Sequence, residues 1–358
     1  MNWIRDIAVE LPLHRRLDED GRFLQPPPPC CATPDRWLAA YSHLWLTRLF
    51  DTRAIELQRT GRLGTYAGCL GQEAVSAAIG HAMLPDDVLV PYYRDQAAQL
   101  ARGVRMLSIL RFWGGDEWGA HDGPAQDLTW CIPIATQLTH AAGVAAALKL
   151  RHEHRVVVTT CGDGASSRGD FYEAMNLAGV WHLPLVIVIN NNQWAISVPL
   201  HQQTAAPTLA QKALACGIPG VRVDGNDYFA MTAILEEALQ RARSGKGPTL
   251  IEAVTYRLCD HTTADDMSRY ADAPTREEAA RHEPLLRFRK LLDRELEWSD
   301  ARQAELEAGL TQRIDQDIRD YLALPPSRPE DMFDFLYAQL PADLARQKAA
   351  WLARRKPS

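Results

Sequence analysis

The chain has 358 residues, a formal net charge of −6 and 46% hydrophobic residues, which indicate a globular protein with a large core. No basic patch interleaves with the aromatic residues, which argues against nucleic-acid binding. No run reaches the roughly 20 apolar residues of a membrane helix, and the first residues lack a signal-peptide hydrophobic region. The seven cysteines are scattered without zinc-like spacing, which suits a reducing cytoplasm. We therefore expect a soluble cytoplasmic protein.

In chain order, residues 1–34 form a predicted N-terminal arm. Its polyproline run 26–29 is semi-rigid and favours lying on a neighbour over forming a domain. A helix-start signal opens the main domain, predicted for residues 35–274, and 72–83 predicts a second helix. Strand-like runs alternate with helices, at 88–91, 155–160, 185–189, 221–223 and 248–258. This alternation predicts an α/β fold with a doubly wound, mostly parallel sheet flanked by helices.

The last part of the chain, residues 275–358, is a predicted charged, helical extension. A proline-rich break at 325–329 precedes a short amphipathic helix predicted at 331–339. Its aromatic face contains Phe333, Leu336 and Tyr337. We expect this face to pack on the core or on a partner.

Two polar loops follow neighbouring predicted strands. Asp163 lies between two glycines directly after the strand at 155–160, and three asparagines, 190–192, follow the strand at 185–189. Apolar residues at helical spacing predict that 170–181 crosses over between them. Ligands of open α/β sheets bind beyond the carboxyl ends of the strands, where both loops would meet. Although a lone Gly-Asp-Gly is usually a plain turn, the paired loops predict a site for Mg²⁺ and a diphosphate.

These loops resemble the fingerprint of thiamine diphosphate enzymes. The run 162–176, followed by 183–184 and 191–197, is similar to the α subunit of two-subunit 2-oxo acid dehydrogenases. Further segments similar to the same family are 61–64, 71–74, 92–95 and 256–263. The similarity spans roughly residues 35–295 and implies the thiamine diphosphate-binding fold, specifically its diphosphate-binding domain.

The resemblance implies a role for individual residues. Asp163 and Asn192 supply side-chain ligands to Mg²⁺, and Trp194 supplies its main-chain carbonyl. Tyr93, Arg94 and His261 hold the diphosphate, and His261 is also the implied catalytic residue, because a histidine there can move protons near neutrality. The other implied cofactor-binding residues are Ile132, Ile134, Gly162, Gly164, Ala165, Asn190 and Ile196. Thr136 and Gln137 resemble a monovalent-cation site of branched-chain members, which would hold K⁺.

Several assignments have ordinary alternatives. Asn190 stands where the family often has a longer phosphate-binding side chain. His261 by itself could be a plain surface or core histidine. Tyr93-Arg94 could simply mark the start of a helix capped by Asp95, with no role in phosphate binding. In the segment 114–123 the similarity is ambiguous, so that His121 is either the histidine that the family carries there or an exposed loop residue.

The chain contains one predicted sheet, whereas the resemblance implies a site built from two α/β domains. The second domain, with the glutamate that activates the cofactor, would come from a β subunit in an assembly of two α and two β chains. The implied activity is oxidative decarboxylation of a 2-oxo acid, with acyl transfer to the lipoyl group of an acyltransferase. Pyruvate is favoured because 71–74 and 169–176 look most like bacterial pyruvate dehydrogenase α chains. A branched-chain 2-oxo acid is the alternative, on the strength of the segment at 136–137.

Two functions of other classes are also considered. The chain could be a non-catalytic structural subunit, but Asp163, Asn192, Arg94 and His261 are intact. It could be a nucleotide-binding module, but no glycine-rich loop ending in Lys-Ser/Thr is present to hold a triphosphate.

Overall fold

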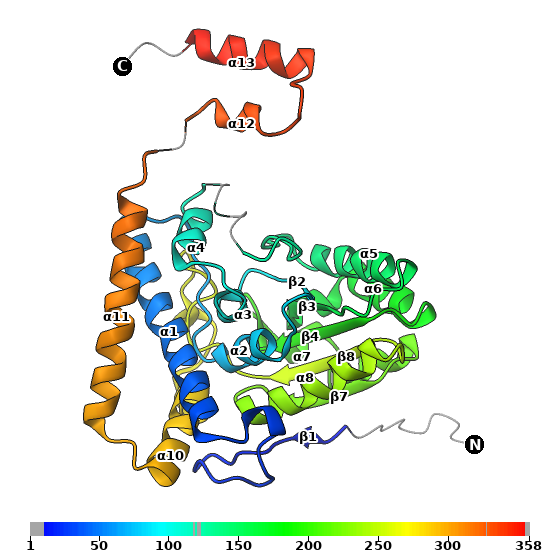
Figure 1. Ribbon diagram of the computed structural model, residues 1–358, viewed down its shortest axis with the longest axis vertical. Helices are drawn as coiled ribbons and strands as arrows, with labels where there is room; N and C mark the ends of the chain where they lie inside the picture. Colours follow the sequence, from blue (N-terminus) through cyan, green and yellow to red (C-terminus); the bar gives the residue numbers. More distant parts are fainter. Residues whose placement is uncertain (1–10, 117–118, 120–122, 327, 355–358) are drawn as a thin grey trace.

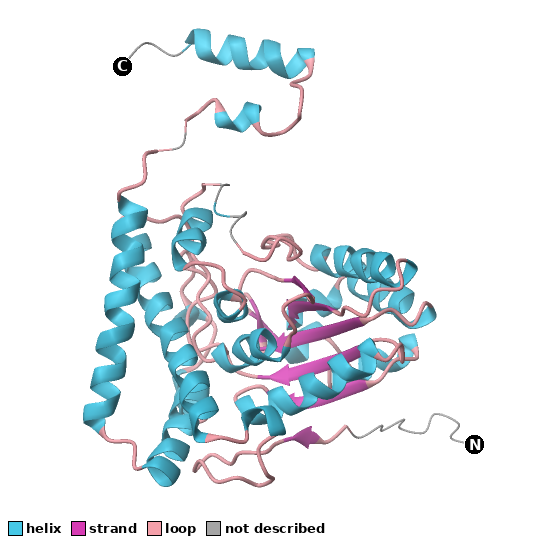
Figure 2. Cartoon of the chain, in the orientation of Figure 1, coloured by secondary structure: helices cyan, strands magenta, loops and turns pink. Residues whose placement is uncertain are grey.

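A parallel sheet of six strands forms the centre of the computed structural model, which describes residues 11–354 except 117–118, 120–122 and 327 (Figures 1 and 2). The strand order is β1-β7-β8-β4-β3-β2, and neighbouring strands all run parallel. The strands are β1 (Leu13–His14), β2 (Val88–Val90), β3 (Val157–Gly162), β4 (Leu185–Asn191), β7 (Gly220–Asp224) and β8 (Thr249–Val254). The predicted α/β fold is confirmed.

Helices cover both faces of this sheet. α2 (Glu73–Ala82) and α8 (Tyr228–Arg243) pack with Val186 and Val188 of β4, whereas α5 (Thr136–Leu150) and α6 (Gly169–Val180) pack with the alternate residues of the same strand. Successive side chains of a strand point to opposite faces, so a strand buried on both sides must be apolar throughout. The continuous apolar run of β4 has this origin.

A further group of helices packs beside the sheet. α1 (Pro34–Arg59), α4 (Met106–Trp113) and α11 (Asp300–Leu322) share a separate apolar cluster, and α11 runs along α1 in Figure 1. The remaining helices are α3 (Gln96–Ala101), α9 (Ala273–Arg281), α10 (Pro284–Leu296), α12 (Asp331–Asp334) and α13 (Ala342–Arg354). α12 and α13 project beyond the end of α11, away from the sheet (Figure 1).

The short C-terminal helix differs from its prediction. It ends at Asp334, and Leu336 and Tyr337 are both exposed. Only Phe333 of the predicted aromatic face has a ring neighbour, Trp351 of α13. This face therefore does not pack on the core of its own chain.

The N-terminal arm belongs to the sheet of its own chain. β1 pairs with β7 at the edge, and Leu17 is buried in the main apolar cluster. Asp227, which caps α8, also accepts hydrogen bonds from the backbone N–H groups of Arg16 (2.6 Å) and Leu17 (2.7 Å). The start of the arm is therefore an edge strand held to the chain's own core, while contact of the polyproline run 26–29 with a neighbour stays a prediction.

The two polar loops meet at the carboxyl edge, as predicted. Gly162 at the end of β3 is in register with Asn190 of β4. Short elements follow at this edge: η3 (Asp163–Ser167), the hairpin of β5 (Trp194–Ala195) and β6 (Val198–Pro199), and α7 (Leu200–Gln203). The loop after β8 contains η5 (Met267–Arg269), while η1 (Pro29–Cys31) and η4 (Ala210–Cys216) lie elsewhere in the chain.

Candidate active site

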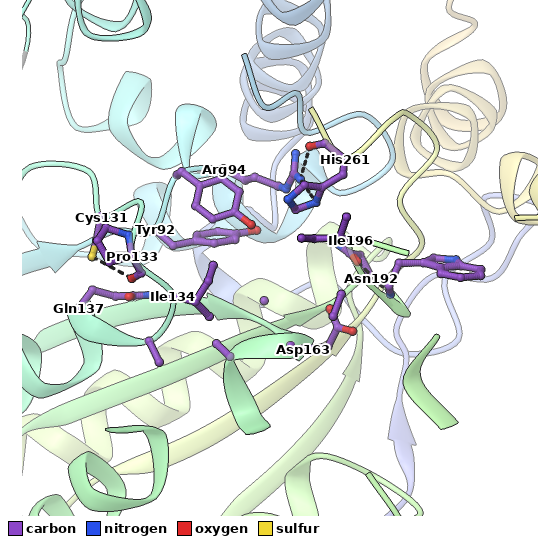
Figure 3. Close-up of a pocket in the computed structure, with 17 residues that line it drawn as sticks. Tyr92, Arg94, Cys131, Pro133, Ile134, Gln137, Asp163, Asn192, Ile196 and His261 are labelled. Atoms are coloured by element: carbon purple, nitrogen blue, oxygen red, sulfur yellow. Dashed lines mark hydrogen bonds between the residues drawn. The ribbon is translucent and has the colours of Figure 1, made fainter. Parts of the chain in front are cut away.

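A cavity of about 200 Å³ opens at the carboxyl edge of the sheet (Figure 3). Arg94 and His261 lie on one side of it, and Asp163 and Asn192 lie on the other (Figure 3). Segments far apart in the chain supply the wall, and most of the residues predicted from the sequence contribute to it. These are Tyr93, Arg94, Ile134, Gly162, Asp163, Gly164, Ala165, Asn192, Trp194, Ile196 and His261.

Two of the described residues that were predicted to bind the cofactor do not line this cavity. Asn190 is buried, and its side chain donates to the Tyr92 hydroxyl (3.1 Å) and accepts from the Thr255 hydroxyl (2.8 Å). Ile132 is about half exposed beside the cavity. A third residue, His121, lies outside the described residues.

The wall also contains Gln137, which was predicted as part of the K⁺ site, and further residues for which no role was predicted. These are Tyr92, Cys131, Pro133, Ala135 and Ala195. Arg257 reaches His261 from behind, and Gln203 reaches Asp163. Arg257 lies within the segment 256–263, which is similar to the family, so its residue type and position could have identified it from the sequence. Gln203 carries no such signal, because its partner lies 40 residues away in the sequence.

Two buried arginines supply positive charge at the cavity. Arg94 is 1% exposed and donates to the backbone oxygens of Gly68 and His261. Arg257 is fully buried and donates to the backbone oxygen of Ile196 (2.8 Å) and to the Tyr270 hydroxyl (2.6 Å). In the part of the chain that is described, neither guanidinium has a carboxylate oxygen within 4.0 Å. Because buried charges are normally paired, this side of the cavity is built to receive an anion.

His261 lies between these two cations. Its Nδ1 faces Arg94 Nη2 at 3.0 Å and Arg257 Nη1 at 3.3 Å. A guanidinium can only donate, so Nδ1 accepts and the neutral ring carries its hydrogen on Nε2. Burial, reinforced by the charges of Arg94 and Arg257, lowers the pKa of His261 to about 3. With these neighbours the pKa of His261 lies below its ordinary value, and a further negative charge beside the ring would raise it.

The opposite side of the cavity offers oxygen ligands. Asp163 is 1% exposed, burial raises the pKa of its carboxyl group, and its Oδ2 accepts from Gln203 Nε2 at 2.8 Å. Asn192 donates from Nδ2 to Gln72 Oε1 (3.2 Å), which turns its Oδ1 toward the backbone N–H of Trp194 (3.2 Å). Carboxylate, amide and carbonyl oxygens are the ligands of a hard cation such as Mg²⁺.

These oxygens do not form a complete metal site alone. Among the described residues, no group of three or more His, Cys, Asp or Glu side chains is placed to hold a metal ion. A cation at Asp163 would therefore need further oxygens from a ligand, as Mg²⁺ commonly takes from phosphates. The buried carboxylate and the two unpaired guanidinium groups thus fit a metal-bound diphosphate.

The backbone around the cavity is shaped for close approach. Ile196 has φ 56°, in the left-handed region that a β-branched residue rarely adopts, and its side chain is 55% exposed into the cleft. Gly164 is needed because a Cβ there would lie 2.7 Å from the Cβ of Ala195. The β5–β6 hairpin is thereby held directly over the Asp163 loop.

The fold and the cavity together define a thiamine diphosphate-binding α/β domain. The family model described as "Dehydrogenase E1 component" matches residues 41–329. The chain belongs to this family, and it is the α subunit of a thiamine diphosphate-dependent 2-oxo acid dehydrogenase. An α subunit of this component implies a partner β subunit.

The chain is similar to curated proteins whose names give two different substrates. The chain is 40% identical over 319 residues to 3-methyl-2-oxobutanoate dehydrogenase subunit alpha of Mycobacterium tuberculosis, covering 87% of this chain and 85% of the relative. It is 37% identical over 346 residues to pyruvate dehydrogenase E1 component subunit alpha of Staphylococcus aureus, covering 96% and 94%. The subunit of the same name from Mycoplasma genitalium is 35% identical over 342 residues, covering 95% of each chain.

No helix in the described part of the chain is both long enough and apolar enough to cross a lipid bilayer.

Proposed function

We propose that this chain acts with its β subunit, as two α and two β chains in the cytoplasm, in the oxidative decarboxylation of pyruvate. The acyl group would pass to the lipoyl arm of an acyltransferase component. The observation that carries the proposal is the cavity itself, in which the buried, carboxylate-free guanidinium of Arg94 faces the buried carboxylate of Asp163, with Arg257 behind His261. That arrangement suits a diphosphate held through a metal ion.

The residues of this chain would position the cofactor. When bound, thiamine diphosphate supplies the carbanion that attacks the 2-oxo carbon and the electron sink that follows. Arg94 would hold the diphosphate, with Tyr93 beside it, and Arg257 would add a second positive charge from behind His261. Asp163, Asn192 and the carbonyl of Trp194 would hold Mg²⁺. Fixed anchoring of this kind lowers the entropic cost of bringing the reacting atoms together.

His261 would handle protons at the edge of this site. Because its Nδ1 accepts from two guanidinium groups, its Nε2–H is the group free to donate. A diphosphate next to the ring would raise the pKa from about 3, since it offsets the two positive charges that lower it. His261 then becomes able to give and take a proton during acyl transfer.

We also propose a monovalent cation, K⁺, at Thr136 and Gln137. Gln137 is buried, its Nε2 donates to the Thr160 carbonyl (2.8 Å), and its Oε1 has no hydrogen-bond partner in the described structure. A buried, unpaired amide oxygen costs free energy, and a cation ligated there would remove that cost. Loss of K⁺ should then lower the thermal stability of the wild-type assembly but not that of Gln137→Leu.

A branched-chain 2-oxo acid is the second candidate substrate. It is favoured by the 40% identity to the 3-methyl-2-oxobutanoate dehydrogenase subunit and by the Thr136-Gln137 segment. Pyruvate is favoured by the two pyruvate dehydrogenase subunits, which the chain matches over 95% or more of its length.

The test is reconstitution with the β subunit and comparison of kcat/KM for pyruvate and 3-methyl-2-oxobutanoate. A preference for pyruvate of tenfold or more is expected, and an equal preference for the branched substrate would move the assignment to the second candidate. Calorimetry with thiamine diphosphate and Mg²⁺ on the same assembly separates a catalytic from a structural subunit. Absence of binding there would reject both substrates and leave a structural role.

A further inference from the structure

Two adjacent cysteines of the N-terminal arm form a thiol pair. Cys30 and Cys31 directly follow the polyproline run 26–29, and their Sγ atoms lie 3.5 Å apart. Cys30 is exposed and Cys31 is buried. The backbone here is fixed, because the Cys31 carbonyl accepts from Trp37 Nε1 (2.6 Å) and its N–H donates to the Pro28 carbonyl (2.8 Å). The two sulfurs are therefore held together before any ligand arrives, which lowers the entropic cost of binding one.

The spacing of this pair disfavours a disulfide. Consecutive Cα atoms are about 3.8 Å apart across a trans peptide, whereas the Cα atoms of a disulfide are usually roughly 4.4–6.8 Å apart. Closing the sulfurs to about 2.05 Å would strain the intervening peptide. A single atom that bonds to both sulfurs needs no such closure, because it fills the gap between them.

The type of bridging atom follows from the donors present. A linear two-coordinate metal ion requires its two sulfurs on opposite sides, which adjacent residues with sulfurs at 3.5 Å do not provide. Tetrahedral zinc requires four ligands, and the described ranges contain no group of three or more His, Cys, Asp or Glu side chains that could hold a metal ion. A trivalent arsenic atom that already carries one carbon substituent is pyramidal and needs two sulfurs only. The pair supplies that number at a narrow spacing.

The surroundings of Cys31 favour its thiolate form. Hydrogen bonding from Cys30 lowers the pKa of the Cys31 thiol, burial opposes this, and Tyr228 and Thr232 lower it further. The Tyr228 hydroxyl is itself 2.8 Å from His81 Nδ1, so the ring can donate to the hydroxyl while the hydroxyl donates to sulfur. Hydrogen bonding with Cys31 and burial raise the pKa of the Cys30 thiol, and Glu236 raises it further. The thiolate is the nucleophilic form, so the environment of Cys31 assists formation of an As–S bond while the exposed Cys30 gives the reagent access.

We propose that Cys30 and Cys31 form a chelating site for monosubstituted trivalent arsenicals, R–As=O. In the reaction, two As–S bonds form and the arsenic–oxygen bond breaks. The oxygen leaves as water with the two thiol protons, and arsenic stays trivalent, so no oxidant is required. The site shares no residue with the catalytic cavity. It stands whether or not the proposed substrate is correct.

Phenylarsine oxide is the probe for this site, used on the full-length chain assembled with its β subunit. In excess monothiol, the intact mass of the α chain should show one phenylarsenic group in place of two hydrogens, and the count of free thiols should fall by two. Peptide mapping should place the adduct on the peptide that contains both Cys30 and Cys31. The fluorescence of Trp37 should change on binding, because its indole N–H donates a hydrogen bond to the Cys31 carbonyl.

Three single variants decide the matter. Cys30→Ser and Cys31→Ser should each weaken retention of the probe by about 100-fold or more, because the second bond forms at high effective concentration. Cys216→Ser, which removes another partly exposed cysteine, should behave as wild type. Since Cys30 is exposed, Cys30→Ser keeps the test valid if Cys31→Ser fails to fold.

Several results would overturn the proposal. One is wild-type retention of the probe by Cys30→Ser, and another is an adduct mapped to any other cysteine. A third is ready closure of the pair to a disulfide by oxidised glutathione, seen as a loss of two hydrogens on the arm peptide. That result would contradict the argument from the spacing of the sulfurs.

Discussion

Replacing Gln203 by leucine removes a single hydrogen bond from the proposed metal ligand. Gln203 Nε2 donates to Asp163 Oδ2 (2.8 Å) and also to the Val198 carbonyl (3.1 Å), so it ties the carboxylate to the β5–β6 hairpin. Because Oδ2 accepts this bond, Oδ1 would be the carboxylate oxygen available to the proposed metal ion. Leucine keeps the size of the side chain and removes the donor. We therefore expect Gln203→Leu to weaken Mg²⁺ binding without unfolding the domain.

The size of the effect follows from the type of bond. A hydrogen bond to a charged group contributes about 1.5–3 kcal/mol, which corresponds to roughly 10- to 100-fold in an equilibrium constant. Loss of a residue that orients a metal ligand typically costs about 10- to 100-fold in metal affinity. Gln203 is partly exposed, so water can replace part of the lost bond. We expect about a tenfold rise in the Kd for Mg²⁺.

The assay titrates Mg²⁺ into the assembled protein at saturating thiamine diphosphate and follows the fluorescence of Trp194, which lines the cavity. Gln202→Leu, on the exposed neighbour in the same helix, is the matched control and should bind as wild type. Excess Mg²⁺ should restore the kcat of Gln203→Leu, because the ligand is misoriented rather than lost.

A Kd within twofold of wild type would refute the positioning role of Gln203. A fall in Tm together with a kcat that excess Mg²⁺ does not restore would show that the residue only stabilises α7. Failure of the wild-type assembly to bind Mg²⁺ at all would instead reject the proposed cofactor site.

Four further predictions concern the same edge of the sheet. Asp163→Ala should abolish cofactor binding in calorimetry with little change in Tm, since a loop carboxylate adds little to the core; near-normal activity would contradict this. The chain without its β subunit should show no decarboxylation, because the activating glutamate is absent, and measurable turnover would disprove the split site. The loop 259–270 should exchange its amide hydrogens quickly without cofactor and slowly with it, since few of its side chains are apolar; equal protection would remove the order–disorder claim. On acidification, thermal melts should show a smaller loss of stability for His261→Asn than for the wild type. His261 takes up a proton below a pKa of 6.5 in the unfolded chain but only near 3 in the folded chain, so the wild type becomes less stable as the pH is lowered from 6.5 toward 3. Parallel pH profiles would show that His261 is not the group responsible.

The sequence predicted the sheet and the meeting point of the loops because both depend on local patterns. A strand buried on both faces is apolar on both, and β4 shows this from Leu185 to Ile189. Parallel strands then bring their carboxyl ends to one edge, so Asp163 and Asn192 were placed together without knowledge of any contact.

The failures have equally physical reasons. β4 extends to Asn191, and side chains alternate along a strand. Asn190 therefore turns toward Tyr92 and Thr255, Asn191 turns toward Glu252, and only Asn192, beyond the strand, reaches the cavity. β1 has two residues, too few for any period to show in the sequence. Gln203 acts through a contact between distant segments, which no local pattern records.

The rim of the cavity has the character of a surface that a second chain would cover. Ile132, Ile134 and Ile196 are each about half exposed around a cavity whose floor carries buried charged groups. An apolar rim of this kind is typical of a surface that another chain covers. Covering it would exclude water from Arg94 and His261 and so strengthen their interaction with a diphosphate. Burial of the three isoleucines by a β subunit would therefore also strengthen the hold on the diphosphate, which is a physical reason to expect that the chain needs its β subunit for the proposed activity.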